Sequence, residues 1–208
     1  MAKVTLAIPT NRGVKGKTVQ SLLELVAHSS KEHELHILVS ERGYTIAEQR
    51  NYIVVQAQKN KSDYVLMVDD DMTFPPNTLE KLLAHNKDAI GVKSYSKVLP
   101  LCPTVGLMDE NGKYMHPDNF PFLEYPKELF KAYFVGAGVL LIKMSVFEKI
   151  EKPYFAFETY EEEELKGMVK NGEDGVFCAK VREAGVEVYC DPTLPIGHLG
   201  EMEYKEIK

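Results

Sequence analysis

Short apolar runs alternate with amphipathic segments in the first half of the chain. The apolar runs lie at residues 4–8, 36–39, 64–68 and 89–92. Each run is too short for an independent helix, so each predicts a buried strand. Between the strands, apolar residues recur at helical spacing, and a second helix is expected at about 46–59. The first helix is expected to turn four apolar residues inward, namely Val19, Leu22, Leu23 and Val26. This order predicts a parallel sheet with right-handed crossovers, whose strand ends face one crevice.

The second half of the chain has a different rhythm. Residues 93–131 are rich in proline, glycine and aromatic residues and show no helical period. Within this segment, Asn111-Gly112 predicts a small β-hairpin with arms at 104–108 and 113–115. Further strands are expected at 133–135, 139–142 and 186–189, with a helix opening at Gly172. The acidic run 161–164 is interpreted as a solvated surface.

Length and composition favour one α/β domain spanning residues 1–208, since no linker divides the 208 residues. The net charge of −6 and the pI near 5.6 argue against nucleic acid as a partner, because phosphate backbones require a basic face. No apolar run approaches the roughly 20 residues of a membrane span, and the N-terminus enters a strand directly. A cytoplasmic protein without a transmembrane segment is therefore expected. Its three cysteines lack metal-ligand spacing and are expected to be reduced thiols.

The acidic stretch Asp69-Asp70-Asp71 directly follows the predicted strand 64–68. Ligands of open α/β sheets bind beyond the carboxyl ends of the strands, where these carboxylates would lie. In an extended continuation of the strand, Asp69 and Asp71 share one side and could hold one cation. Carboxylate oxygens favour Mg²⁺ or Mn²⁺. The alternative is a polar cap on a strand that ends in a turn, since Pro75-Pro76 follows.

Several motifs, in order along the chain, are similar to those of nucleotide-sugar-dependent glycosyltransferases of the GT-A fold, especially family 2. They are Ile8-Pro9-Thr10, Glu48-Gln49-Arg50-Asn51, Val68-Asp69-Asp70-Asp71, Val135-Gly136-Ala137-Gly138, Gly172-Glu173-Asp174 and His198. The resemblance implies a Rossmann-like, mostly parallel sheet flanked by helices, with the hairpin as an insert. It also implies a nucleotide-binding half, 1–92, and an acceptor-binding half, 93–208.

The resemblance assigns a donor site and a metal site. Asp71 would hold Mn²⁺ or Mg²⁺ on the donor diphosphate, Asp69 would lie near the ribose and metal, and His198 would complete the metal shell. The alternative for His198 is an exposed loop histidine. Glu41 would replace the aspartate that usually meets the nucleobase, which leaves UDP- and GDP-sugars both open. The other donor-binding residues implied are Pro9, Thr10, Asn11, Arg12, Arg50, Asp70, Gly136, Ala137 and Gly138. The alternative for Arg50 is a surface cation on a helix.

Glu173 and Asp174 resemble the acidic pair that provides the general base in inverting members. Asp174 is the preferred base, taking a proton from an acceptor hydroxyl while that oxygen attacks the sugar. The acceptor class, whether glycan, lipid-linked or another hydroxyl compound, stays open. The competing explanation for the pair is helix stabilisation, because acids in a first turn interact favourably with the helix dipole.

Two other functions fit the acidic stretch. Residues 69–73 obey the Asp-x-Asp-x-Thr pattern of Mg²⁺-dependent haloacid-dehalogenase-like phosphatases, in which the first aspartate is a nucleophile. That motif normally ends the first strand of its domain, whereas two strand-helix units precede it here. The third possibility is a non-catalytic module that binds a nucleotide sugar without turnover.

Overall fold

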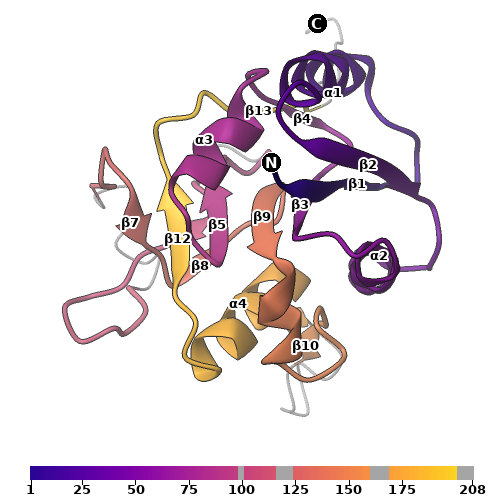
Figure 1. The fold of residues 1–208 in the computed structure, drawn as a ribbon. Helices are drawn as coiled ribbons and strands as arrows, with labels where there is room; N and C mark the ends of the chain where they lie inside the picture. The colour runs from indigo at the N-terminus through magenta and orange to yellow at the C-terminus, as the bar shows by residue number, and fades with distance from the viewer. Residues whose placement is uncertain (98–100, 116–123, 160–168, 201–208) are drawn as a thin grey trace, which may run out of the picture.

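A computed structural model describes residues 1–97, 101–115, 124–159 and 169–200, so the acidic run 161–164 lies outside the described residues. Its centre is a seven-stranded sheet (Figure 1). The strand order is β2 (Glu34–Ser40), β1 (Lys3–Pro9), β3 (Tyr64–Val68), β9 (Val139–Lys143), β5 (Ala89–Val92), β12 (Val188–Asp191) and β7 (Phe130–Lys131). Five strands run in one direction, and β9 and β7 run in the other. The predicted mostly parallel sheet is confirmed.

Helices cover both faces of the sheet (Figure 1). The helices α1 (Gly16–Ser29) and α3 (Thr78–Ala84) share one apolar cluster with the sheet, and α2 (Ile46–Lys59) and α4 (Glu173–Glu183) share the other. Along β3, Leu66 and Val68 belong to the first cluster, while Val65 and Met67 belong to the second. Strand β3 is therefore buried on both faces, because successive side chains alternate.

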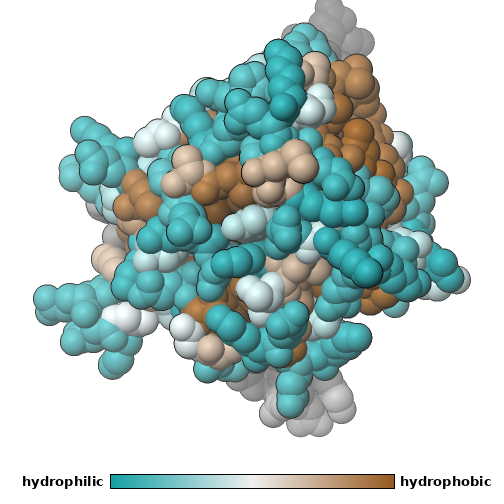
Figure 2. Space-filling model, viewed as in Figure 1, coloured by the Kyte–Doolittle hydropathy of each residue, from teal (hydrophilic) through white to brown (hydrophobic). Residues whose placement is uncertain are grey.

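Helix α1 is rotated relative to the sequence prediction. Val19 and Leu23 were expected to face inward, but they are 39% and 65% exposed. The buried positions are Thr18, Ser21, Leu25 and Ser29. Small polar side chains allow close approach here, and the Ser21 hydroxyl accepts a hydrogen bond from the backbone N–H of Phe74 at 3.3 Å. Figure 2 accordingly shows hydrophobic surface around α1 and the edge strand β2, where Ile37 and Val39 are also exposed.

Short two-stranded sheets and turns occupy the second half. The predicted turn at Asn111-Gly112 forms, with the Gly112 N–H donating to the Asp109 carbonyl at 3.0 Å and one bridge between Met108 and Tyr114. The predicted hairpin also forms next to this turn, where the Asp109 N–H donates to the Lys113 carbonyl at 2.9 Å and the Met115 N–H donates to the Leu107 carbonyl at 3.0 Å. The start of the predicted first arm pairs elsewhere, because β6 (Val105–Gly106) pairs with β8 (Phe134–Val135). The remaining elements are β4 (Met72–Thr73) paired with β13 (Gly197–His198), β10 (Glu158–Thr159) paired with β11 (Val169–Asn171), and the 3-10 helix η2 (Met144–Glu148).

Two smaller predictions concern cysteines and membranes. All three cysteines are free thiols, and burial raises the pKa of Cys178 to about 12, so it stays protonated near neutral pH. Within the described residues, no helix is both long enough and apolar enough to cross a membrane.

Candidate active site

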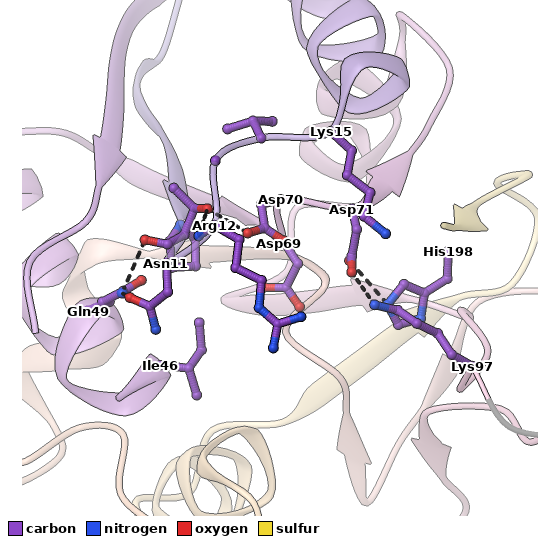
Figure 3. Close-up of a pocket in the computed structure, with 14 residues that line it drawn as sticks. Asn11, Arg12, Lys15, Ile46, Gln49, Asp69, Asp70, Asp71, Lys97 and His198 are labelled. Carbon is purple, nitrogen blue, oxygen red and sulfur yellow. Dashed lines mark hydrogen bonds and ion pairs between the residues drawn. The ribbon is translucent and has the colours of Figure 1, made fainter. Parts of the chain in front are cut away.

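A cavity of about 710 Å³ lies at the carboxyl ends of β1 and β3 (Figure 3). Its position agrees with the crevice expected at the strand ends of an open α/β sheet. Its size falls within the usual range for small-molecule sites. The lining residues are Pro9, Thr10, Asn11, Arg12, Gly13, Val14, Lys15, Ile46, Gln49, Asp69, Asp70, Asp71, Lys97 and His198. The wall therefore combines three carboxylates with three basic side chains and a histidine.

The acidic stretch forms a tight turn and does not continue the strand. The backbone N–H of Met72 donates to the Asp69 carbonyl at 3.2 Å, which reverses the chain into β4. The expectation that Asp69 and Asp71 share one side of an extended segment is therefore wrong. Asp70 is held separately, since the Thr10 hydroxyl donates to its carboxylate at 2.6 Å and the Lys15 N–H to its carbonyl at 2.9 Å. Each carboxylate of the turn thus has its own partners.

Asp71 meets His198 and Lys97 (Figure 3). The residue is only 8% exposed, one carboxylate oxygen lies 3.1 Å from His198 Nε2, and the other pairs with Lys97 Nζ. His198 Nδ1 lies 2.7 Å from the carbonyl oxygen of Tyr95, which only accepts, so Nδ1 carries the hydrogen. In the neutral imidazole, Nε2 then directs its lone pair toward Asp71. A metal-binding histidine is commonly oriented in this way by its second nitrogen.

The donor atoms of Asp71 and His198 fit Mn²⁺ or Mg²⁺. One carboxylate oxygen and one imidazole nitrogen at this separation would hold one cation with open positions for further ligands. Among the described residues, no three histidine, cysteine, aspartate or glutamate side chains form a metal-binding group. Substrate or water oxygens would have to supply the remaining ligands.

Backbone pairing brings His198 to the acidic turn. Strand β13 pairs antiparallel with β4, so His198 lies opposite Met72. The N–H of Leu199 donates to the Asp71 carbonyl at 2.8 Å, and Lys15 Nζ donates to the Leu199 carbonyl at 2.9 Å. The alternative of an exposed loop histidine is wrong, because His198 is half-buried and held on both sides.

Arg50 is a buried link behind the cavity. It is 2% exposed, and its guanidinium donates to Asp69 at 2.7 Å, to Glu173 at 3.2 Å and to the Ala137 carbonyl at 3.3 Å. The alternative of a surface cation is therefore wrong. Burial disfavours the charged guanidinium, but the attraction of Asp69 and Glu173 outweighs burial and raises the pKa of Arg50. Burial raises the pKa of Asp69, and the Arg50 charge opposes that rise.

The acidic pair of α4 lies at the first turn of that helix, as expected. Glu173 bonds to Arg50 and is therefore connected to Asp69 through one side chain. Asp174 accepts a hydrogen bond from the N–H of Gly175 at 2.7 Å. Neither acid belongs to the lining of the cavity. The start of α4 is thus linked to the acidic turn through Glu173 and Arg50. Asp174, the second acid of the helix, is not bound to Arg50.

The sequence model of the family "Glycosyl transferase family 2" matches residues 8–150, more than two thirds of the chain. The chain belongs to this family. The match spans the first loop, the acidic turn and strand β9. This membership agrees with the glycosyltransferase resemblance and replaces the phosphatase alternative, whose nucleophile would be Asp69, here bonded to Arg50.

Solved structures show the same fold for this family 2 glycosyltransferase. The crystal structure of A197 from STIV is 20% identical, with a TM-score of 0.64 over 96% of this chain and 86% of that one. The crystal structure of GalNAc-T7 with UDP, GalNAc and Mn2+ is 13% identical, with a TM-score of 0.56 over 98% of this chain and 45% of that one. The chain therefore has a GT-A-like fold and spans less than half of the second protein. No curated protein sequence is a significant match to it.

The cavity of the glycosyltransferase contains most of the expected donor-binding residues. Those that line it are Pro9, Thr10, Asn11, Arg12, Asp69 and Asp70, and the expected metal ligands Asp71 and His198 line it as well. Glu41 is exposed and lies outside this lining. Gly136, Ala137 and Gly138 are buried behind it, where a side chain on Gly136 would meet Thr104 at 2.9 Å. These glycines thus permit close approach between parts of the protein.

Six lining residues were not predicted from the sequence, namely Gly13 and Val14 of the first loop together with Lys15, Ile46, Gln49 and Lys97. Lys15 lies within the first loop, which was expected at residues 10–16, and Ile46 and Gln49 lie at the start of α2, in or near the Glu48-Gln49-Arg50-Asn51 motif. Proximity to these motifs was a usable signal for all three. Lys97 belongs to the irregular segment after β5, which has no periodic pattern, and nothing in the sequence marked it.

Replacing Arg50 by methionine is expected to destabilise the glycosyltransferase by about 3 kcal/mol. The change leaves the carboxylates of Asp69 and Glu173 without their shared cation, and losing one partner of a buried ion pair is costly. Urea unfolding of Arg50→Met beside the wild type measures the loss. Arg42→Met, which removes the same charge from an exposed position, is the control. Equal stability of the Arg50 and Arg42 variants would contradict this role.

Proposed function

We propose that this glycosyltransferase uses a nucleoside diphosphate sugar, UDP- or GDP-linked, together with Mn²⁺ or Mg²⁺. The observation that carries the proposal is the 3.1 Å approach of Asp71 and His198 Nε2 on the wall of a cavity that also contains Arg12 and Lys15. A carboxylate and a correctly oriented imidazole suit a divalent cation, and neighbouring basic groups suit a diphosphate. The halves 1–92 and 93–208 would bind the nucleotide and the acceptor respectively.

In this proposal the first loop and the acidic turn bind the donor. Asn11 and Arg12 contact the base or ribose, and Asp69, held by Arg50, accepts a hydrogen bond from the ribose. Asp70 keeps the first loop in place through its bond from Thr10. Asp71 and His198 would hold the cation. When bound, the cation acts as a Lewis acid that stabilises the negative charge developing on the departing diphosphate.

The proposed reaction is a direct displacement with inversion at the anomeric carbon. Asp174 takes the proton of the acceptor hydroxyl, and that oxygen forms a bond to the anomeric carbon. The bond between this carbon and the diphosphate oxygen breaks, and the nucleoside diphosphate leaves with the bonding electrons. Asp174 is preferred over Glu173 because the Glu173 carboxylate is already bonded to Arg50. The acceptor is a glycan, a lipid-linked compound or another hydroxyl compound.

Calorimetric titration with UDP and with GDP, each with Mn²⁺ and with EDTA, tests the proposed donor site. One of the two nucleotides is expected to bind at least about tenfold more tightly with Mn²⁺, because the cation links the diphosphate to Asp71 and His198. The same titration with UMP or GMP is the control, since a monophosphate lacks the bridging group. Failure of both diphosphates to bind would contradict the proposed donor class.

A further inference from the structure

Lys97 is the second cation at Asp71. It lies in the segment after β5, and its side chain is 39% exposed, whereas the Asp71 side chain is 11% exposed. Its Nζ pairs with one carboxylate oxygen while His198 Nε2 faces the other (Figure 3). A nearly buried carboxylate is therefore neutralised by a side chain that itself remains close to solvent.

This ion pair occupies the same carboxylate that would bind a divalent cation. A metal ion bound to Asp71 would bring two more positive charges against the ammonium of Lys97, and the two cations would compete for one carboxylate. Lysine has a long flexible stem and a compact charge, so it can leave the carboxylate at a small conformational cost. Binding of the metal and the position of Lys97 are therefore linked.

A bound donor would offer Lys97 a second anionic partner. Lys97 lines the same wall as Arg12 and Lys15, facing the space proposed for the diphosphate. The ammonium of Lys15 already donates to the Leu199 carbonyl at 2.9 Å. Lys97 is thus the lysine of this wall whose described partner is the proposed metal ligand.

We propose that Lys97 is an exchangeable counter-cation, which neutralises Asp71 until a divalent cation binds and then passes to the diphosphate of the donor. The proposal rests on the proposed function and adds to it the order in which Lys97, the metal and the diphosphate exchange partners. Metal alone binds weakly, because it must displace Lys97. The diphosphate provides the displaced ammonium with a new anionic partner, so metal and nucleotide favour each other's binding.

The variant Lys97→Met tests the exchange by two binding measurements with opposite expected signs. Affinity for Mn²⁺ alone, titrated without nucleotide, is expected to rise about five- to tenfold, since no ammonium competes for Asp71. Affinity for UDP or GDP in saturating Mn²⁺ is expected to fall by a similar factor, since one contact to the diphosphate is lost. Lys97→Arg retains the charge and is expected to stay within about twofold of the wild type for Mn²⁺ alone.

Lys113→Met is the matched control, because it removes one exposed lysine from the turn at residues 109–113, outside the cavity lining. It is expected to leave both affinities unchanged. Unchanged or weaker Mn²⁺ binding by Lys97→Met would overturn the exchange. The exchange would also be overturned if the wild type binds nucleotide equally well in Mn²⁺ and in EDTA and Lys97→Met loses this binding. Lys97 would then be a permanent replacement for the metal.

The two proposals fail differently. If neither UDP nor GDP binds the wild type, the proposed donor class is wrong whatever Lys97 does. If a nucleotide binds with Mn²⁺ but Lys97→Met changes neither affinity, the donor class stands and the exchange is wrong. The Mn²⁺ titration without nucleotide gives its result independently of both.

Discussion

Replacing Asp174 by asparagine is expected to abolish sugar transfer while leaving nucleotide binding intact. The amide keeps the size of the side chain and can still accept the hydrogen bond from the Gly175 N–H, but it cannot take a proton from an acceptor hydroxyl. General-base catalysis contributes about 10²–10⁴ to rate, so turnover should fall by about a thousandfold. Transfer to the acceptor and Mn²⁺-dependent nucleotide affinity are measured on the same preparation.

Two further variants provide the comparisons needed to interpret this result. Glu183→Gln changes an exposed acid at the other end of α4 and is expected to leave turnover unchanged. Glu173→Gln separates the two candidate bases, since its partner is Arg50. Wild-type turnover in Asp174→Asn, together with loss of turnover in Glu173→Gln, would move the base to Glu173. Wild-type turnover in both variants would exclude the acidic pair as the base.

Replacing Asp71 by asparagine is expected to remove the metal dependence of nucleotide binding. The neutral amide loses the charge that would attract the cation, leaving His198 as the remaining described ligand. Loss of a group that only orients a metal ligand costs about 10–100-fold in metal affinity, so loss of a ligand itself should cost at least about a hundredfold. Titrations of the variant with nucleotide in Mn²⁺ and in EDTA should therefore coincide.

Asp70→Asn is the control for the Asp71 variant, because it changes the neighbouring acid, whose carboxylate accepts a bond from Thr10. It is expected to keep a difference between Mn²⁺ and EDTA, even if nucleotide affinity falls in both. A retained Mn²⁺ effect in Asp71→Asn would assign the cation to another carboxylate.

The sequence predicted the sheet well because its signals are local. The run Tyr64–Val68 forms β3 with the expected bounds, and the helix expected at 46–59 forms as Ile46–Lys59. The first segment is too short for an independent helix, and the second has apolar residues at helical spacing. Asp71 was predicted as a cation ligand from its position after a buried strand, whereas His198 was found only by resemblance to a family, since nothing in the spacing of the two residues indicates that they meet.

What the sequence did not predict depends on contacts between distant segments. The turn at Asp69 changed the direction of the carboxylates, because β4 must reverse to pair with β13. Arg50 was expected at the surface or on the diphosphate, yet it is buried between two acids from different elements. Lys97 reaches Asp71 from an irregular segment. Helical or strand periodicity carries no information about such pairings.

The pairing of β13 with β4 also concerns the kinetics of the site. A two-residue strand is held by few hydrogen bonds, so it opens at a lower free energy than the seven-stranded sheet. Asp71 and His198 are far apart in the chain, and contacts of high sequence separation generally form slowly. We therefore expect His198 to reach Asp71 late in folding. If Asp71 and His198 hold a cation, as proposed, brief detachment of this strand would release the cation from an otherwise folded protein. The lifetime of the pairing would then limit the residence time of the metal.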